Sequence, residues 1–237
     1  MPVALITGAS AGFGRALAGA LAQQGWQLVI DARNADRLAT AAAGLPDGSL
    51  VRAIPGDVAD AAHRAELARV IAELPGLDLL VNNASTLGET PLPQLADARS
   101  DQLELTYRVN LLGPLGLIQL LLPSLRRSSG TVVNLSSDAA VADYPGWGGY
   151  GSSKAALDHL TRTFAAEEPA LRWYSFDPGD MRTEMHQAAF PGEDISDRPE
   201  PAAVAPLLLR LLAAAPPSGR YQASQFEPAT EHLQPAR

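Results

Sequence analysis

Residues Val3-Ala-Leu-Ile-Thr7 lead into Gly8-Ala-Ser-Ala-Gly12-Phe-Gly14 and then into an Ala- and Leu-rich stretch, Arg15 to Gln24. A short apolar run predicts a buried strand, and a longer Ala/Leu-rich stretch predicts a helix. The glycines between them allow a tight turn and a close approach of the backbone to a pyrophosphate, which the N-terminus of a helix stabilises. The amino-terminal stretch therefore predicts a dinucleotide-binding strand–turn–helix unit.

Strand-like and helix-like segments alternate along the rest of the chain. Further strands are predicted at 27–30, 50–54, 77–81, 131–135, 171–176 and 220–223, and further helices at 61–74, 100–125 (bent or interrupted near Gly113-Pro114), 149–168 and 204–214. This alternation predicts an α/β Rossmann fold, a doubly wound parallel sheet of about seven strands with helices on both faces. We expect residues 1–237 to form a single domain, with a substrate loop or lid at 185–201 and a frayed tail at 227–237.

Composition excludes several classes of function. The net charge of −8 and the pI near 5.0 argue against nucleic acid as the main partner. The chain has no cysteine, which excludes disulfides and thiolate chemistry. Its four histidines (His63, His159, His186 and His232) lie far apart and are expected on the surface or in packing contacts, so no metal site is expected. The amino terminus lacks a basic leader, and the longest apolar stretch, 111–122, is too short to span a bilayer, so we expect a cytoplasmic protein without a membrane partner.

A second stretch, from Ser137 to Tyr150-Gly-Ser-Ser-Lys154, carries candidate catalytic groups. A tyrosine four residues before a lysine shares its helical face, and a nearby ammonium is expected to lower the phenol's pKa from about 10. Such a phenol can exchange a proton with a substrate oxygen. Ser137 follows the predicted strand 131–135, at the sheet edge where α/β folds bind ligands. Taken alone, the Tyr-x-x-x-Lys pair has an alternative interpretation as a solvated helix pair.

Several spaced motifs resemble those of the short-chain dehydrogenase/reductase family, in its compact type. The matching residues are Thr7-Gly8, Gly12 and Gly14 of the turn, the segment Asn82-Asn83-Ala84-Ser85, the set Asn110, Ser137, Tyr150 and Lys154, and Pro178-Gly179 followed by Thr183. In the second motif Ser85 replaces the final glycine of the family's Asn-Asn-Ala-Gly segment. The match covers nearly the whole chain in the expected order.

The resemblance implies hydride transfer between a nicotinamide and a carbonyl or alcohol. It implies that Tyr150 donates a proton to the developing alkoxide and that Lys154 lowers the phenol's pKa and binds the nicotinamide ribose. It further implies that Ser137 holds the carbonyl oxygen, and that Asn110 holds a water linking Lys154 to solvent. For each residue the alternative is a capping or helix-surface role.

The choice between NADPH and NADH depends on the residues after the second strand. The acid of NAD-preferring relatives would stand at position 32, which is Ala here, and Arg33 occupies the position used by NADP-preferring relatives, so NADP(H) is favoured over NAD(H). Asp31 is left as an alternative ribose ligand or as a turn cap, and Ala11 stands where NADP-preferring relatives often have a basic residue. Asp57 is expected at the adenine, with turn formation as its alternative. The expected cofactor-binding residues are Gly8, Ser10, Gly12, Phe13, Gly14, Arg33, Asn34, Asp57, Val58, Asn83, Ala84, Tyr150, Lys154, Pro178, Gly179, Met181 and Thr183.

Within the family the chain is most similar to sepiapterin reductases, in segments such as Gly146-Trp147 and Pro178-Gly-Asp-Met-Arg-Thr-Glu-Met185. The acidic residue that anchors the pterin in those enzymes corresponds to Ala223, which argues against a pterin substrate. Side chains expected to wall a substrate pocket, with ordinary packing as the alternative, are Leu87, Tyr144, Trp147, Met181, Met185 and Phe190.

The leading hypothesis is an NADPH-dependent carbonyl reductase acting on a small ketone, dicarbonyl or alcohol. Alternatives are a sepiapterin reductase-like pterin side-chain reductase, an NAD-dependent alcohol dehydrogenase and a non-catalytic dinucleotide-sensing protein. The resemblance also implies a homodimer or homotetramer joined through the helices around 100–125 and 150–167.

Overall fold

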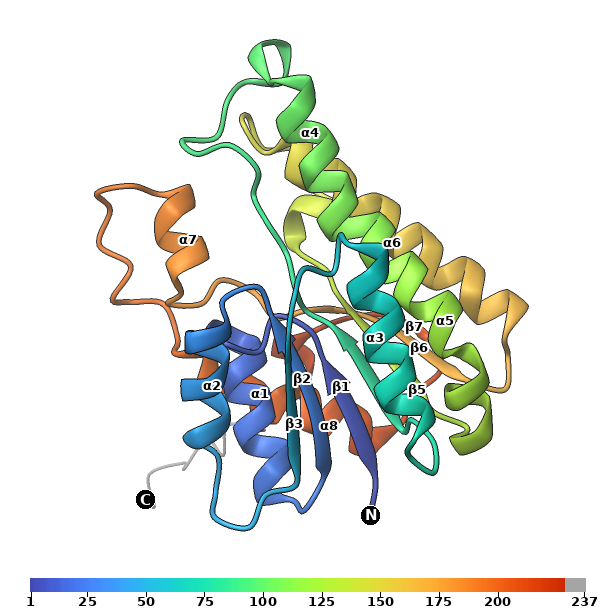
Figure 1. Cartoon of the computed structure of the whole chain (residues 1–237). Coiled ribbons are helices and arrows are strands. Elements are labelled where there is room, and N and C mark those ends of the chain that lie inside the picture. Colours follow the sequence, from blue (N-terminus) through green and yellow to red (C-terminus); the bar gives the residue numbers. More distant parts are fainter. Residues whose placement is uncertain (229–237) are drawn as a thin grey trace, which may run out of the picture.

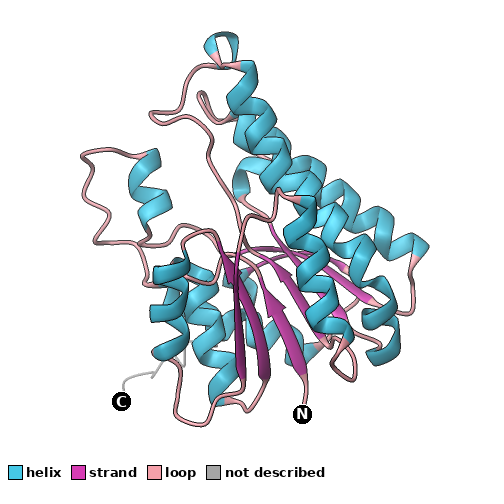
Figure 2. Cartoon of the chain, viewed as in Figure 1, coloured by secondary structure: helices cyan, strands magenta, loops and turns pink. Residues whose placement is uncertain are grey.

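Seven parallel strands form one sheet in the order β3-β2-β1-β4-β5-β6-β7 in a computed structural model that describes residues 1–228 (Figures 1 and 2). The strands are β1 (Val3–Ile6), β2 (Gln27–Ala32), β3 (Val51–Pro55), β4 (Leu79–Asn82), β5 (Thr131–Leu135), β6 (Arg172–Asp177) and β7 (Gly219–Gln222). The strand order reverses at β1, which pairs with β2 on one side and β4 on the other. The carboxyl ends of β1 and β4 therefore part at the switch point where sheets of this type bind ligands.

Helices cover both faces of the sheet. One face carries α1 (Gly12–Gln23), α2 (Ala35–Ala43) and α8 (Pro201–Ala214), and the other carries α3 (Ala61–Ala72), α5 (Gly113–Ser128) and α6 (Gly148–Glu167) (Figure 1). Successive residues of β1 point to opposite faces, so Ala4 and Ile6 join the core beneath α1 and α8, whereas Val3 and Leu5 join the core beneath α3 and α5. Burial on both faces explains why the strands are continuously apolar.

All seven predicted strands are present, which confirms the predicted fold class. Sequence analysis missed α2, which lies between β2 and β3. Its nine residues bury only Leu38 and Ala41, too few to produce a clear helical period in the sequence. The helix begins at an N-cap, because the side chain of Asn34 accepts a hydrogen bond from Arg37 N at 2.9 Å.

The predicted long helix 100–125 is interrupted as expected, slightly before Gly113-Pro114. It comprises α4 (Ser100–Tyr107), a π-helical segment at Arg108–Leu112 and then α5. A regular α-helix would need the amide of residue 114 to donate to the carbonyl of residue 110, and Pro114 has no N–H. The backbone therefore adjusts at the turn that carries Asn110.

By length and composition alone, the helical run 100–128 is long and apolar enough to cross a membrane. The sequence analysis had assessed only its apolar stretch 111–122, which is too short to do so. The apolar residues Leu117, Ile118, Leu121 and Leu125 of the run are buried in the core beneath α3 and α5. This burial is what a core helix of a globular fold shows.

The segment predicted as a substrate loop or lid, 185–201, contains most of the short helix α7 (Glu184–Ala189) and is otherwise irregular up to α8. Helix α7 lies beyond the carboxyl ends of the strands, apart from the helical layers (Figure 1). In the described part of the chain, three short 3₁₀ helices occur at Leu95–Asp97, Asp138–Ala140 and Ala223–Phe226. Of the predicted tail at 227–237, residues 229–237 lie outside the described residues.

Candidate active site

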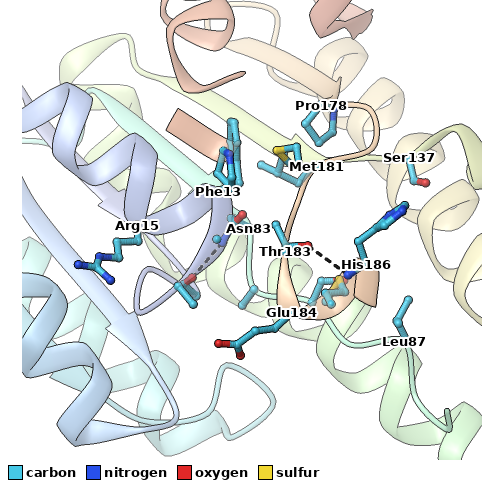
Figure 3. Close-up of a pocket in the computed structure, with 18 of the residues that line it drawn as sticks. Phe13, Arg15, Asn83, Leu87, Ser137, Pro178, Met181, Thr183, Glu184 and His186 are labelled. Carbon is cyan, nitrogen blue, oxygen red and sulfur yellow. Dashed lines mark hydrogen bonds between the residues drawn. The ribbon is translucent and has the colours of Figure 1, made fainter. Parts of the chain in front are cut away.

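A cleft of about 1830 Å³ runs along the carboxyl ends of the strands. In Figure 3, Arg15 lies at one end of it and Ser137 and Leu87 lie at the other, with Asn83 and Thr183 between them. Every predicted site residue lines this cleft except Gly14, which packs beneath the glycine turn, and Asn110, which is buried behind Ser85. Among residues 1–228 no group of three or more side chains could hold a metal ion.

Two glycines of the turn after β1, Gly8 and Gly14, leave no room for a side chain. A Cβ at Gly8 would stand 2.8 Å from Ala84 Cα, and one at Gly14 would stand 2.7 Å from Gly8 O. Asn83 holds the turn, because its side-chain amide donates to Thr7 O at 2.8 Å and to Gly8 O at 3.1 Å (Figure 3). The turn opens onto the cleft at the N-terminus of α1, so the backbone is shaped to receive a pyrophosphate.

Asp31 supports the same turn from below. Its carboxylate accepts from Gly8 N at 2.9 Å, and its other oxygen lies 2.9 Å from Nε2 of the buried His63. His63 reaches this position because Gly56 has no side chain; a Cβ there would stand 2.1 Å from His63 Nδ1. Burial raises the pKa of Asp31, and the hydrogen bonds from His63 and Gly8 act in the opposite direction.

The contacts of Asp31 match neither of its expected roles, since both oxygens are already engaged below the turn. Position 32 is a buried alanine, and Arg33 is exposed at the cleft. Two further arginines that the sequence did not single out, Arg15 and Arg37, line the same end. Three arginines therefore line the cleft here, together with the carboxylates of Asp36, Asp57 and Glu184.

Arg37 also connects α2 to α7. Its guanidinium makes two hydrogen bonds with the carboxylate of Glu184, at 2.7 and 2.9 Å, and both side chains are largely exposed. Thr183, expected at the cofactor, caps α7 by accepting from His186 N at 3.1 Å (Figure 3). Asp57 forms the turn that was its alternative interpretation, because its carboxylate accepts from Ala59 N at 2.8 Å.

Tyr150 and Lys154 lie on one face of α6, as the spacing predicts, and both side chains are buried. Lys154 Nζ lies 5.6 Å from the centroid of the Tyr150 ring and donates to Leu135 O at 2.7 Å, so the ammonium is held by the end of β5. Burial lowers the pKa of Lys154 to about 8, with the charge of Asp158 acting in the opposite direction.

The expected fall in the pKa of Tyr150 does not occur in this structure. Burial raises the pKa of the phenol, and the neighbouring hydroxyls of Ser137 and Ser85 only partly oppose that effect through hydrogen bonding. The prediction was wrong because it weighed the nearby cation without the desolvation of the phenolate. The loss of solvent around the hydroxyl depends on the tertiary structure.

Ser137 lies at the end of β5, beside the Tyr150 hydroxyl, as predicted. Its hydroxyl donates to Asp138 Oδ1 at 2.9 Å and accepts from Ala139 N at 3.2 Å. The other oxygen of Asp138 accepts from the Tyr144 hydroxyl at 3.0 Å. Asp138 therefore orients two hydroxyls at the mouth of the cleft.

Asn110 is buried, and protein groups use the hydrogen-bonding capacity of its side chain. Its amide donates to Thr86 O at 2.9 Å and to Ser153 Oγ at 3.0 Å, and its Oδ1 accepts from Thr86 N at 2.9 Å and from Ser85 Oγ at 3.1 Å. The side chain thus ties the loop after β4 to α6. Its expected water-holding role stays a prediction.

Arg220 on β7 is a positioning residue that sequence reasoning missed. Its guanidinium donates to Ser137 O and to Asp177 Oδ2, both at 2.9 Å, and to Asp158 Oδ2 at 3.2 Å. Asp177 in turn accepts from the amide of Gly179 at 3.1 Å. One side chain thereby connects the serine loop with the Pro178-Gly179 loop. A lone arginine in a short edge strand carries no sequence signal for this role.

The catalytic end of the cleft is walled by apolar and aromatic side chains. Leu87, Trp147 and Met185 pack with Tyr150 in one cluster, and the ring of Trp147 lies 5.7 Å from that of Tyr150 and 5.8 Å from that of Phe190. Met181 packs instead against the core that contains Phe13, and the two lie together in Figure 3. Ala223 is buried in the same core, so its position offers no polar group to a ligand.

Comparisons with known proteins agree with this geometry. A family model described as short chain dehydrogenase matches residues 2–194. The chain is 39% identical over 202 residues to the sepiapterin reductase of Meriones unguiculatus, covering 79% of this chain and 77% of that protein. It is 36% identical over 185 residues to the serine 3-dehydrogenase of Agrobacterium fabrum, covering 76% and 72% respectively.

Among solved structures, an alcohol dehydrogenase from the archaeon Thermococcus sibiricus, complexed with 5-hydroxy-NADP, matches with a TM-score of 0.84 at 31% identity. That match covers 94% of this chain and 95% of the other. The chain therefore belongs to the short-chain dehydrogenase family and is a nicotinamide-dependent oxidoreductase.

Proposed function

We propose that this protein is an NADPH-dependent carbonyl reductase that transfers a hydride between a nicotinamide and a small ketone, dicarbonyl or the corresponding alcohol. The observation that carries the proposal is the Tyr150 hydroxyl, desolvated at the cleft beside Ser137, with Lys154 on the same helical face. A desolvated phenol keeps its proton until an oxygen with developing negative charge is placed against it.

The cleft fits a dinucleotide. The side-chain-free turn at Gly8, Gly12 and Gly14 would receive the pyrophosphate, and Asn83 keeps that turn in shape. When bound, the reduced nicotinamide supplies the hydride that reaches the carbonyl carbon. Lys154, a buried cation at the end of β5, would bind the ribose next to the nicotinamide.

The residues of this chain then act on the carbonyl oxygen. Ser137 holds that oxygen and stabilises its growing charge. Tyr150 transfers its phenolic proton to the same oxygen, which completes the alcohol and leaves a phenolate. Arg220 fixes Ser137 by binding its backbone carbonyl. The main-chain carbonyl of Asn110, which Pro114 cannot satisfy as a helical donor, would hold a water that returns a proton towards Lys154.

NADPH is favoured over NADH by charge at the adenosine end. Arg33 is exposed there with Arg15 and Arg37 nearby, and a guanidinium binds a 2′-phosphate through charge-assisted hydrogen bonds. Asp31, the one acid that would repel this phosphate from the end of β2, is engaged by Gly8 and His63 instead. The Thermococcus sibiricus neighbour, complexed with an NADP derivative, supports the same preference.

The substrate end favours a small apolar carbonyl compound, because Leu87, Trp147 and Met185 pack with Tyr150, and Phe190 packs against Trp147. The similarity to a sepiapterin reductase favours a pterin side-chain ketone as the second candidate. Ala223 argues against it, because a buried pterin amine would lack a carboxylate partner there.

We also propose a cytoplasmic homodimer or homotetramer. Leu112 and Leu120 expose nearly half of their side chains on the π-helical segment and α5, where the sequence predicts subunit contacts. Size-exclusion chromatography with light scattering tests this, and a monomer at micromolar concentration contradicts it.

The test of function is NADPH and NADH oxidation over a panel of ketones, diketones and sepiapterin. We expect turnover of small ketones or diketones with NADPH, at a lower KM than with NADH. Turnover of sepiapterin alone would favour the pterin reductase. Dinucleotide binding without turnover of any substrate or of the reverse alcohols would favour a dinucleotide sensor.

A further inference from the structure

Asp158 is a buried carboxylate that the proposed mechanism does not use. It lies on α6 four residues after Lys154, so the two side chains share a helical face one turn apart, and both are buried. Lys154 Nζ donates to Leu135 O at 2.7 Å. The next residue along the chain, Ser136, donates from its Oγ to Asp158 Oδ2 at 2.8 Å. Two consecutive residues at the end of β5 therefore hold the ammonium and the carboxylate.

A second cation binds the same carboxylate. Arg220 Nε donates to Asp158 Oδ2 at 3.2 Å from β7. The other oxygen, Oδ1, is buried and accepts no hydrogen bond from the described residues 1–228. A buried carboxylate with one unpartnered oxygen needs opposite charge nearby. That charge comes from Arg220 across the sheet edge and from Lys154 on the carboxylate's own helix.

The other acidic groups on the elements packed against α6 are engaged elsewhere. Asp177 of β6 accepts from Arg220 at 2.9 Å, and the carboxylate of Asp138, after β5, accepts from two hydroxyls. The remaining titratable or charged groups on these elements are the phenol of Tyr150 and the solvent-exposed pair Glu104 and Arg108. Asp158 is therefore the carboxylate that shares the buried helical face of Lys154.

We propose that Asp158 is a positioning residue whose carboxylate, anchored by Arg220 and Ser136, is the counter-charge that keeps the Lys154 ammonium protonated at the working pH. The inference rests on the proposed function, in which charged Lys154 binds the nicotinamide ribose. Burial lowers the pKa of Lys154 to about 8, and the charge of Asp158 opposes that effect. Without the carboxylate, we expect the ammonium to lose its proton near neutral pH.

Lys154 is the only lysine in the 237-residue chain, so its titration can be followed directly. Protein labelled with [ε-¹³C]lysine gives one NMR signal from the chain, which is recorded against pH without added dinucleotide. We expect Asp158→Asn to lower the apparent pKa of Lys154 by about one unit, because it removes the negative charge and keeps the size of the side chain. An unchanged or higher pKa overturns the proposal.

Matched variants separate the charge of Asp158 from its packing. Ser136→Ala removes a hydrogen bond to the carboxylate and leaves its charge, so we expect Lys154 to titrate as in the wild type. If Asp158→Asn alone does not fold, Arg220→Gln is compared with the double variant Arg220→Gln/Asp158→Asn, in which no guanidinium lies beside a neutralised partner. The second substitution should again lower the pKa of Lys154 by about one unit. Equal pKa values in that pair, or a shift in Ser136→Ala as large as that in Asp158→Asn, overturn the proposal.

Carbonyl reduction provides a second test. We expect the loss of kcat/KM in Asp158→Asn, relative to the wild type, to grow about tenfold between about pH 6 and pH 9, because the variant loses the charge of Lys154 about one unit earlier. A loss that is equal at every pH would show a merely structural role and would overturn the proposal. If the wild type turns over no substrate, the proposed function fails, whereas the NMR titration still decides the role of Asp158.

Discussion

Two pairs of buried ionisable side chains lie at opposite ends of the cleft, and they differ in how they are satisfied. At the adenosine end, Asp31 and His63 meet directly at 2.9 Å, and Asp31 also binds the glycine turn. At the catalytic end, Tyr150 and Lys154 share a helical face without a hydrogen bond to each other. Lys154 binds a backbone carbonyl, and burial raises the pKa of Tyr150 while lowering that of Lys154.

We interpret the two pairs as having different roles: the Asp31–His63 pair supports the glycine turn, and the Tyr150–Lys154 pair is suited to proton transfer. In the first pair both carboxylate oxygens of Asp31 are hydrogen-bonded, to Gly8 and to His63, so the pair holds the turn and leaves little to offer a ligand. In the second pair burial disfavours the charged form of both groups, so an arriving charge changes their protonation. We expect chemistry at the end where burial disfavours the charged forms of both groups.

The largest effect should come from Tyr150→Phe, which removes the proton donor and little else. We expect kcat for carbonyl reduction to fall by about 10²–10⁴-fold, the usual contribution of general acid catalysis. NADPH binding, followed by fluorescence, serves as the control and should be unchanged. Full turnover in this variant would contradict the role of Tyr150 as proton donor.

His63→Ala should destabilise the fold by about 3 kcal/mol, because it leaves the Asp31 carboxylate buried with one oxygen unpaired. Urea denaturation measures the change. Joint replacement, Asp31→Leu with His63→Leu, should recover most of the stability yet weaken dinucleotide binding, since Gly8 N loses its acceptor. Equal losses in the single and double variants would contradict a mutually satisfied pair.

Lys154→Met should abolish turnover and yet stabilise the protein at pH 7, by about 2 kcal/mol, because it removes a buried ammonium. The folded protein releases the Lys154 proton near pH 8 and the unfolded chain near 10.5. Between these values the unfolded state binds more protons, so the stability of the wild type rises with pH. The gap between wild type and variant should therefore close over this window in urea titrations. A variant less stable than the wild type at pH 7 would refute a net cost of burying the Lys154 ammonium.

Arg33→Ala should raise the KM for NADPH about tenfold and leave the KM for NADH unchanged, because the lost hydrogen bonds are charge-assisted contacts to the 2′-phosphate. Steady-state kinetics with both cofactors measures this difference. Similar changes for the two cofactors would remove the case for NADPH. They would also make Asp31 a candidate ligand of the ribose again.

Glu184→Gln should have the smallest effect, below about 0.5 kcal/mol on stability, because the Arg37–Glu184 pair is exposed to solvent. Thermal unfolding at low and high salt measures it. A loss of stability as large as that expected for His63→Ala would show that solvent exposure does not explain the different contributions of the Arg37–Glu184 and Asp31–His63 pairs.

Much of the fold was predictable because the strands are buried on both faces and therefore read as continuous apolar runs. Helix α2 was not, since only Leu38 and Ala41 mark its buried side. The candidate catalytic residues Ser137, Tyr150 and Lys154 were proposed from their spacing and family resemblance, and the structure brings them to one end of the cleft. The contacts of His63 and Arg220 were not, because each binds a partner 32 or more residues away in the chain.

The sequence by itself determined the parallel α/β architecture, the glycine turn and the identity of the groups that meet at the cleft, since these depend on periodicity and local spacing. Only the tertiary structure decided the state of those groups. Asp31 is engaged by His63, and the pKa of Tyr150 rises although a cation lies on the same helical face. The physical reason is that hydrogen-bond partners and loss of solvent are supplied by distant segments, whereas a local pattern specifies only which side chains share a face.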